Sequence, residues 1–328
     1  MKKYNVYGVG HALADLEYEV APEQLQAFNI DKGVMTLVDE DRQQEIMGHL
    51  QALSCKKSSG GSAANTMVAL CQLGGTGFFS CKVADDEIGE FYRDDLLNCG
   101  LETNLTQQLA TAGITGKCLV LVTPDTDRTM NTFLGISSTF SEAELVPEAL
   151  AASEYLYMEG YLVSAPNTKA ATIKAREVAQ KAGVKTALSL SDPNMVQFFK
   201  EGLLEIIGSG LDFIFANEVE ALKMADTDNL SDAIAHLQTL ATGFAITRGP
   251  NGSMIFDGTD LLEIAPHPVK AVDTVGAGDM YAGAFLYGLT HNMSYTEAAN
   301  LASVAAAKVV TQFGPRLAIS QTQALLTE

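Results

Sequence analysis

The sequence has few cysteines, and their spacing does not pair them. The five, Cys55, Cys71, Cys81, Cys99 and Cys118, lie far apart, are odd in number and include no Cys-x-x-Cys pair. Disulfide frameworks and zinc sites need paired or closely spaced cysteines. We therefore expect reduced thiols in a cytoplasmic protein.

Long hydrophobic runs and positive charges are scarce as well. No run of about 18 apolar residues exists, so no membrane span is expected, and the first ten residues lack the apolar core of a signal peptide. With 21 basic and 40 acidic residues, the formal net charge is −19. This charge argues against nucleic acid or an anionic membrane as a partner, because phosphate backbones need cations to neutralise them. A small phosphate-bearing molecule stays possible, since backbone N–H groups and a metal ion can hold it.

Short apolar segments alternate with helical segments along most of the 328 residues. Most of the apolar segments are too hydrophobic to have one wet face, which suits a parallel sheet covered on both sides. The expected strands are 4–10, 77–84, 154–160, 185–190, 211–217 and 243–249, and the expected helices include 62–73, 87–99, 167–182 and 231–241. This alternation predicts a doubly wound, mostly parallel α/β sheet flanked by helices.

Two regions break the alternation. Residues 16–40 contain two strand-like segments without a long helix between them, and residues 116–125 and 128–135 form two more, joined by a turn at 125–127. We expect about 13–40 and 112–138 to form a small β-sheet lid within one domain of residues 1–328.

Two common nucleotide-binding patterns are absent. In Gly8–Leu13 a leucine stands in the place of the third glycine of a dinucleotide fingerprint, and Gly113–Cys118 has the wrong spacing for a Walker A loop. A nucleotide would therefore bind in another way.

The segment Asp273–Asp279, DTVGAGD, offers such a way at the expected start of a helix. The N–H groups of Gly276, Ala277 and Gly278, at the positive end of the helix dipole, would form a nest for a transferring phosphoryl group. Asp279 in the first helical turn could take a proton from a substrate hydroxyl. Because the dipole alone also favours an acid there, this segment by itself leaves both interpretations open.

Four motifs in one order resemble the ribokinase-like family, also called the phosphofructokinase B family of sugar and nucleoside kinases. GGSAANTMVALCQLGG (60–75) and DTVGAGDMYAGAFL (273–286) resemble its two signatures, NEVE (217–220) its Asn-x-x-Glu motif and TRGPNG (247–252) its phosphate loop. The resemblance covers essentially the whole chain. It implies a ribokinase-like fold and phosphate transfer from ATP, with Mg²⁺, to an alcohol group.

The opening GVGHALADLEYEV (8–20) and the stretch 189–207 are most similar to the adenosine kinase branch of that family, which implies adenosine as the acceptor. His11 stands where that pattern has asparagine; its imidazole can donate or accept one hydrogen bond and can charge near neutral pH. Acceptors such as a sugar, inosine or guanosine therefore stay open. The alternative from another class is a ligand-binding regulator without chemistry, against which the intact Asp279, Asn217 and Glu220 speak.

The resemblance implies roles at the acceptor side. Asp279 would be the general base for a ribose 5′-hydroxyl, and the amides of 276–278 the anion hole. Asp15 would hold the vicinal hydroxyls, unless it only caps local N–H groups. Gly60 and Gly61 would allow close approach of the sugar, with Asn65 adding an amide contact; a simple loop into a helix is the alternative for the glycines.

The resemblance also implies which residues bind ATP and its metal ion. Asn217 and Glu220, three residues apart, share one face of a helical turn and suit a water-rich Mg²⁺ site. Thr247, Gly249 and Gly252 would line the triphosphate, although a tight hairpin explains these glycines too. Arg128 could close over the phosphates or be an exposed turn residue.

Weaker candidates complete the expected site. Leu13, Met130, Thr132 and Tyr161 would form the purine pocket, or else pack within the lid. By resemblance, Asp273 and the Val275 carbonyl would hold a monovalent cation, commonly K⁺. Monomer and dimer both stay open, because lid strands can pair across two chains or cover one chain's ligand.

Overall fold

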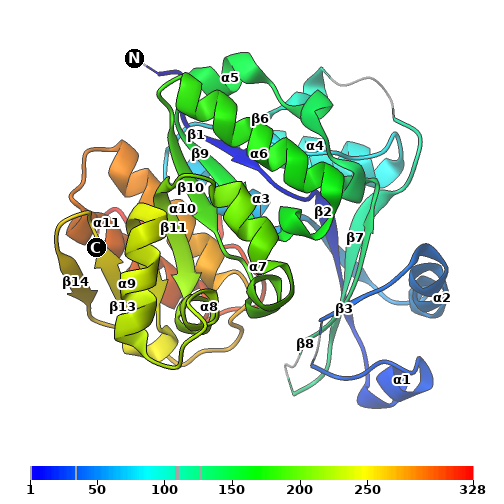
Figure 1. The fold of residues 1–328 in the computed structure, drawn as a ribbon. Coiled ribbons are helices and arrows are strands. Elements are labelled where there is room, and N and C mark those ends of the chain that lie inside the picture. Colours follow the sequence, from blue (N-terminus) through cyan, green and yellow to red (C-terminus); the bar gives the residue numbers. More distant parts are fainter. Residues whose placement is uncertain (1, 34, 108–110, 126–127, 328) are drawn as a thin grey trace.

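The computed structural model describes residues 2–33, 35–107, 111–125 and 128–327, and its larger sheet has nine strands among them (Figure 1). The strand order is β14-β13-β12-β11-β10-β9-β1-β5-β6, parallel from β12 to β6 and antiparallel at β13 and β14. The strands are β1 Tyr4–Val9, β5 Gly77–Ser80, β6 Leu101–Thr103, β9 Ser153–Glu159, β10 Lys185–Ser189, β11 Leu211–Asn217, β12 Ala241–Thr247, β13 Ser253–Phe256 and β14 Leu261–Ile264. The predicted α/β class is confirmed.

Helices cover both faces of this sheet. One face carries α3 Ser62–Gln72, α4 Glu87–Asn98, α10 Ala277–Thr290, α11 Tyr295–Val309 and α12 Ile319–Ala324; the other carries α5 Pro147–Ala151, α6 Pro166–Lys181, α7 Pro193–Ile207, α8 Glu218–Met224 and α9 Leu230–Leu240. Along β9, Tyr155 and Tyr157 enter the first core and Leu156 and Met158 the second. Because successive strand residues point to opposite faces, both faces need apolar residues, and the strands read as continuous hydrophobic runs.

The second sheet is the expected lid, but it is larger than predicted. Its order is β3-β8-β7-β2-β4, with β2 Leu13–Glu19, β3 Met35–Leu37, β4 Cys55–Gly60, β7 Thr115–Val122 and β8 Arg128–Gly135. Strand β4 lies outside the predicted lid boundaries because its sequence, CKKSSG, lacks the apolar alternation of a strand. The expected turn at 125–127 falls partly outside the described residues.

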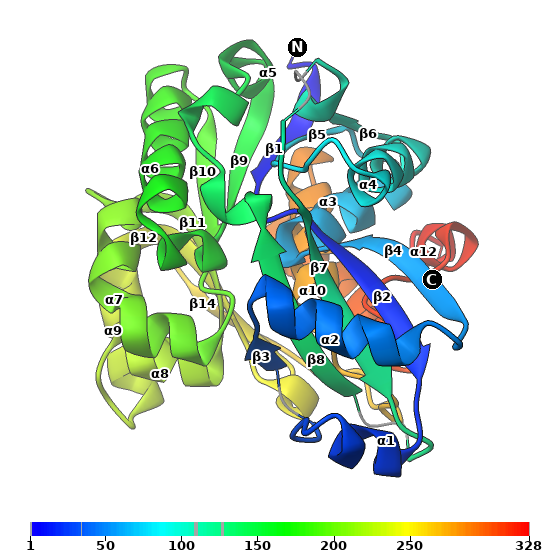
Figure 2. The same ribbon diagram turned by 90° about the vertical axis from the view of Figure 1, so that its right-hand side faces the viewer.

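Two helices that the sequence did not predict, α1 Pro22–Ala27 and α2 Glu40–Leu50, cover one face of the lid, and Figure 2 shows α2 crossing it. Leu16, Leu119 and Leu121 pack there against Leu25 and Ile46. The alternate residues of the same strands face the large domain. This arrangement gives the lid a closed core on one side and a side free to contact a ligand on the other. None of the described helices has the length and apolar character needed to span a membrane.

Candidate functional site

A cavity of about 610 Å³ lies between the inner face of the lid and the carboxyl ends of β10, β11 and β12. In open parallel sheets, this edge is the usual place for ligands. The cavity brings together most of the residues singled out in the sequence: His11, Leu13, Asp15, Gly61, Asn65, Arg128, Met130, Thr132, Tyr161, Asn217, Glu220, Thr247, Gly249, Val275, Gly276, Ala277, Gly278 and Asp279. Gly60, Gly252 and Asp273 do not line it.

The start of α10 forms one end of the cavity. Gly276 is its N-cap, with a φ of 77°, and a Cβ there would lie 2.4 Å from Cβ of Pro315. Only glycine meets both conditions without strain. At Gly278, in contrast, a Cβ would meet no protein atom within 4 Å, so this side of the first turn is open to the cavity.

The three residues of the expected nest lie at the start of α10 and line the cavity. N–H groups in the first turn of a helix have no partner within the helix, but the N–H of Ala277 donates to the carbonyl of Thr274 at 3.3 Å. Ala277 is thus partly satisfied. The amides of Gly276 and Gly278 are the better donors for an anion.

Asp279 is held by two donors from α3. Ser62 Oγ donates to its Oδ1 at 2.6 Å, and Asn65 Nδ2 donates to its Oδ2 at 3.2 Å. Burial raises the pKa of Asp279 to about 6, while both hydrogen bonds and the charge of Arg316 oppose that rise. At neutral pH the carboxyl group is therefore mostly ionised and near the pKa that suits a general base.

Asp15 faces the same cavity from β2. A Cβ on Gly60 would lie 2.3–2.4 Å from its carboxylate atoms, so the glycine makes room for Asp15 and not for a ligand. Burial raises the pKa of Asp15 to about 7, and no residue of the described chain donates a hydrogen bond to its carboxylate. A buried carboxyl group in this state can accept hydrogen bonds from ligand hydroxyls at little cost. Gly61, with a φ of 95°, does line the cavity.

His11 is buried between β1 and β2, and its Nδ1 lies 3.1 Å from Ser137 Oγ. Burial lowers its pKa to about 4. The imidazole is therefore neutral at physiological pH, contrary to the possibility of charging raised above. His11 lines the cavity, but its Nε2 is itself buried away from solvent.

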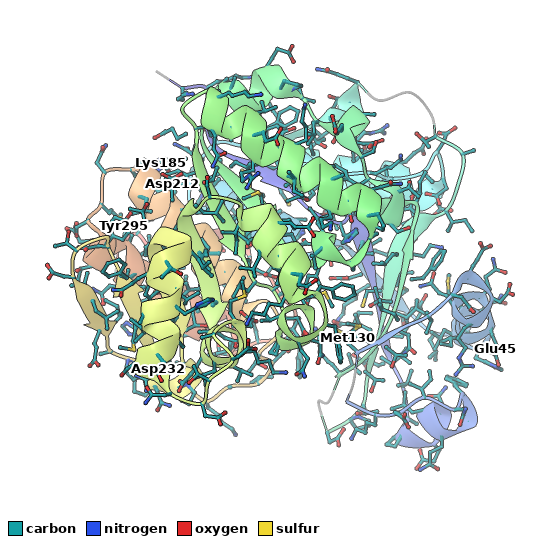
Figure 3. All side chains as sticks on the ribbon, viewed as in Figure 1. Glu45, Met130, Lys185, Asp212, Asp232 and Tyr295 are labelled. Atoms are coloured by element: carbon teal, nitrogen blue, oxygen red, sulfur yellow. The ribbon has the colours of Figure 1, made fainter. Side chains whose placement is uncertain are left out.

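The lid gives the cavity an apolar wall. Leu13, Val120, Met130 and Leu134 line it from the three central strands, and Figure 3 shows Met130 where the lid faces the large domain. Met35 and Leu37 of β3 also line it, although the two residues are 44% and 58% exposed. Covering exposed apolar side chains at a cavity mouth with a flat apolar group is favourable, because it removes apolar surface from water.

Asn217 and Glu220 begin α8, where each caps the other. Glu220 accepts hydrogen bonds from the backbone N and the Nδ2 of Asn217, at 2.9 and 2.7 Å. Glu220 is 4% exposed, and burial, together with the charge of Asp192, raises its pKa to about 7. A buried carboxyl group whose only hydrogen-bond donors are amides suits a hydrated Mg²⁺ ion. The positive charge of the ion would offset the cost of burying the carboxylate charge.

The hairpin from β12 to β13 carries the predicted phosphate loop. Thr247 and Gly249 line the cavity, and at Gly249 a Cβ would meet no protein atom. Gly252 has a φ of 81°, and a Cβ there would lie 2.1 Å from the carbonyl oxygen of Ile264. The lack of a side chain at Gly252 therefore lets β14 pack close to the loop, in line with the hairpin interpretation.

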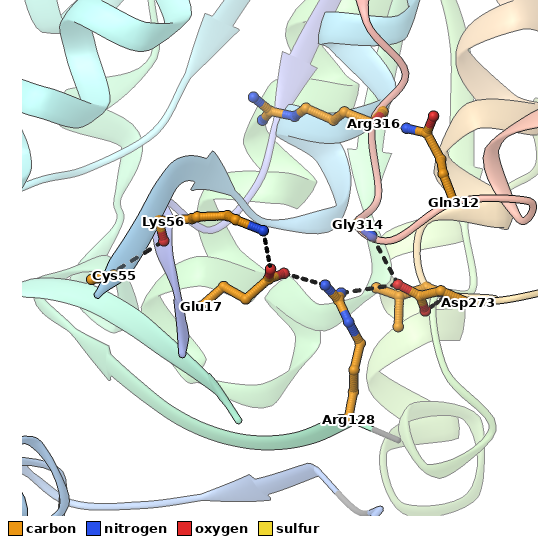
Figure 4. A network of polar contacts seen from close by, with 9 residues as sticks. Glu17, Cys55, Lys56, Arg128, Asp273, Gln312, Gly314 and Arg316 are labelled. Carbon is orange, nitrogen blue, oxygen red and sulfur yellow. Dashed lines mark hydrogen bonds and ion pairs between the residues drawn. The ribbon is translucent and has the colours of Figure 1, made fainter. Parts of the chain in front are cut away.

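Arg128 is not an exposed turn residue. Its side chain is 7% exposed, pairs with Glu17 of β2 and lies 3.1 Å from Asp273 Oδ2 (Figure 4). Asp273 also accepts hydrogen bonds from the N–H groups of Val275 and Gly314. Asp273 thus contacts one guanidinium and two backbone N–H groups, and the monovalent cation that the resemblance implies stays a prediction.

Three contacts in the site escaped the sequence-based predictions. Ser62 carries no motif signal of its own, yet its hydroxyl donates a hydrogen bond to Asp279. Glu159, at the end of β9, accepts hydrogen bonds from the N–H groups of His11 and Ala63 and fixes the backbone beside the cavity. Arg316 contacts Asn65. Such contacts join positions up to 251 residues apart, which no local pattern indicates.

Comparisons with known proteins show to which proteins this chain is similar. A family model described as "pfkB family carbohydrate kinase" matches residues 30–322. Adenosine kinase of Saccharomyces cerevisiae is 26% identical over 329 residues, which cover 94% of this chain and 95% of that protein. The solved structure of an adenosine kinase from Sinorhizobium meliloti is 33% identical, with a TM-score of 0.88 and 99% of each chain covered. A probable sugar kinase from Rhizobium etli is 29% identical, with a TM-score of 0.89 over 100% of this chain and 99% of that one.

Proposed function

Since the chain belongs to the pfkB family of carbohydrate kinases, we propose that it transfers the γ-phosphate of ATP to the 5′-hydroxyl of a nucleoside, with adenosine as the acceptor. Named relatives in this family phosphorylate hydroxyl groups of nucleosides or of sugars. The proposal therefore concerns which acceptor this cavity takes and which residues act on it.

One observation supports the nucleoside most strongly: the cavity has a polar end and an apolar wall. The polar end holds Asp15, Asp279 and the first turn of α10, as a ribose and a phosphoryl group require. The wall of lid side chains, with exposed Met35 and Leu37 at its mouth, suits the flat face of a purine. A free sugar would leave that wall uncovered.

On the acceptor side, each residue has a separate task. Asp15 accepts hydrogen bonds from two neighbouring hydroxyls of the ribose, and neutral His11 borders the ribose site. Asp279 then takes the proton of the 5′-hydroxyl as its oxygen attacks the γ-phosphorus and the bond to ADP breaks. Because Ser62 and Asn65 favour the charged form of Asp279, the base is ready at neutral pH.

On the phosphate side, the amides of Gly276 and Gly278 bind the oxygens on which charge develops, at the positive end of α10. Thr247 and Gly249 border the triphosphate. Glu220 and Asn217 would hold Mg²⁺ through water, and that ion supplies charge neutralisation to the phosphates when bound. No step of this proposal uses a monovalent cation.

The test is ADP release from ATP and Mg²⁺ with adenosine, inosine, guanosine, ribose and fructose, comparing the wild type with Asp279→Asn. We expect turnover with adenosine and its loss in the variant. Asp232→Asn is the matched control, since it also removes an acid from the first turn of a helix, the exposed start of α9 (Figure 3). Its turnover should be unchanged.

Other outcomes would revise specific parts of the proposal. Turnover on a sugar alone would keep the kinase and replace the acceptor, as the similarity to a probable sugar kinase allows. Tight binding of one compound without any ADP release would favour a ligand-binding regulator. Turnover in Asp279→Asn close to that of the wild type would remove Asp279 from its role as base.

A further inference from the structure

Arg316 lies outside the four motifs, in the segment between α11 and α12, and does not line the cavity. Its Nε donates to Oδ1 of Asn65 at 2.8 Å. Its other nitrogens donate to the hydroxyl and the carbonyl of Ser59 and pair with Asp95 of α4 at 3.3 Å. The guanidinium, whose side chain is 14% exposed, thus joins three elements behind the site.

The contact with Asn65 decides how that amide is oriented. Asn65 has its oxygen toward Arg316 and its NH₂ toward Oδ2 of Asp279. In the reverse orientation, the NH₂ group would face the N–H of the guanidinium, and the amide oxygen would face a carboxylate. Both contacts would be repulsive, because guanidinium only donates and a carboxylate only accepts. Arg316 at one end of the amide therefore keeps a donor on Asp279 at the other end.

The charges around Asp279 make that donor important. Asp15 and Glu159, on β2 and β9, are acidic and interact unfavourably with Asp279, and the charge of Asp279 also raises the pKa of Tyr157 and Tyr161. Arg316 is the cation whose charge favours the ionised form of Asp279. Its effect is thus twofold: through space by charge, and through Asn65 by a hydrogen bond.

We propose that Arg316 is a positioning residue for phosphoryl transfer, which fixes the Asn65 amide so that Asp279 is held as an ionised base toward the acceptor hydroxyl. This inference rests on the proposed function, because it takes Asp279 as the base. Arg316 itself touches neither substrate.

The experiment measures kcat and the KM of the acceptor from about pH 5.5 to about pH 9 in Arg316→Met, with saturating ATP and Mg²⁺. The acceptor is the compound turned over fastest by the wild type. We expect the acid limb of kcat to move up by about one pH unit, since an opposite charge has been lost. The rate deficit is then larger at low pH than at high pH, and kcat changes more than KM.

Two further variants sharpen the test. Asn65→Asp keeps the shape and the contact with Arg316 but places an oxygen against Asp279, so its acid limb should move further upward. This variant decides the question if Arg316→Met does not fold. Asp95→Asn removes the ion pair at the far end of the guanidinium and leaves the contact with Asn65, so its acid limb should stay in place.

The outcomes separate the inference from the proposed function. An unmoved acid limb in Arg316→Met and Asn65→Asp, with Asp279→Asn inactive, would keep the base and overturn the role of Arg316. A loss of rate equal at every pH would make Arg316 merely structural. Retained turnover in Asp279→Asn would overturn the base assignment itself.

Discussion

Substituting alanine for Gly60 should weaken acceptor binding without harming the fold. The new Cβ would lie 2.3–2.4 Å from all three atoms of the Asp15 carboxylate group, closer than any real contact, so the carboxylate must leave its place. The backbone at Gly60 is not in the left-handed region, so alanine adds no strain of its own. The change therefore acts through Asp15 alone.

The size of the effect follows from the hydrogen bonds that are lost. Hydrogen bonds to a charged group contribute about 1.5–3 kcal/mol, and about 1.4 kcal/mol corresponds to a tenfold change. We expect the KM for the nucleoside to rise about 10- to 100-fold, while kcat stays within a few-fold, because the base is untouched.

The assay is steady-state ADP release at varied nucleoside concentration, together with a thermal melt. Gly48→Ala is the matched control: it lies in α2 of the lid, and a Cβ there meets no atom within 4 Å. It should leave KM unchanged. A folded Gly60→Ala protein with the KM of the wild type would refute the role of Asp15 as the acceptor's anchor.

Two further predictions concern charge. Burial raises the pKa of Asp279 to about 6; because a base acts only when deprotonated, kcat should fall as the pH drops through about 6, and a pH–rate profile that stays flat well below 6 would contradict this. Because Arg128 takes the charge of Asp273, replacing K⁺ by Na⁺ at constant ionic strength should leave the wild-type rate unchanged, whereas Arg128→Gln should acquire activation by K⁺. Strong K⁺ activation of the wild type would mean that a cation displaces Arg128.

Much of the fold follows from local sequence, as β11 and β8 illustrate. Both strands have the predicted boundaries, 211–217 and 128–135, because their apolar content and bounding turns leave few alternatives. Strand β4 could not be found in this way. CKKSSG becomes a strand because β2 pairs with it over six residues, and that partner is fixed only by the tertiary fold.

The candidate site was predictable where one short segment supplies neighbouring lining residues, as Gly276–Asp279 does. It was less predictable where a residue serves a distant neighbour. Gly60 and Gly252 look like ligand-contacting glycines, but one clears space for Asp15 and the other for Ile264. The neutrality of His11 likewise comes from burial, which depends on elements far along the chain.

The contacts of Arg316 with Ser59 and Asn65 have a consequence for how the protein is made. They close loops of 257 and 251 residues, so this part of the site forms only when the segment from Ser59 to Arg316 is present. Such distant contacts form late in folding, because a long loop must close before they contribute. During synthesis, the lid and much of the sheet can fold while Arg316 is still inside the ribosome. The contact of Arg316 with Asn65, which orients the donor to Asp279, cannot yet form. Catalytic competence should then appear only after Arg316 has left the ribosome, when most of the secondary structure that precedes it has formed.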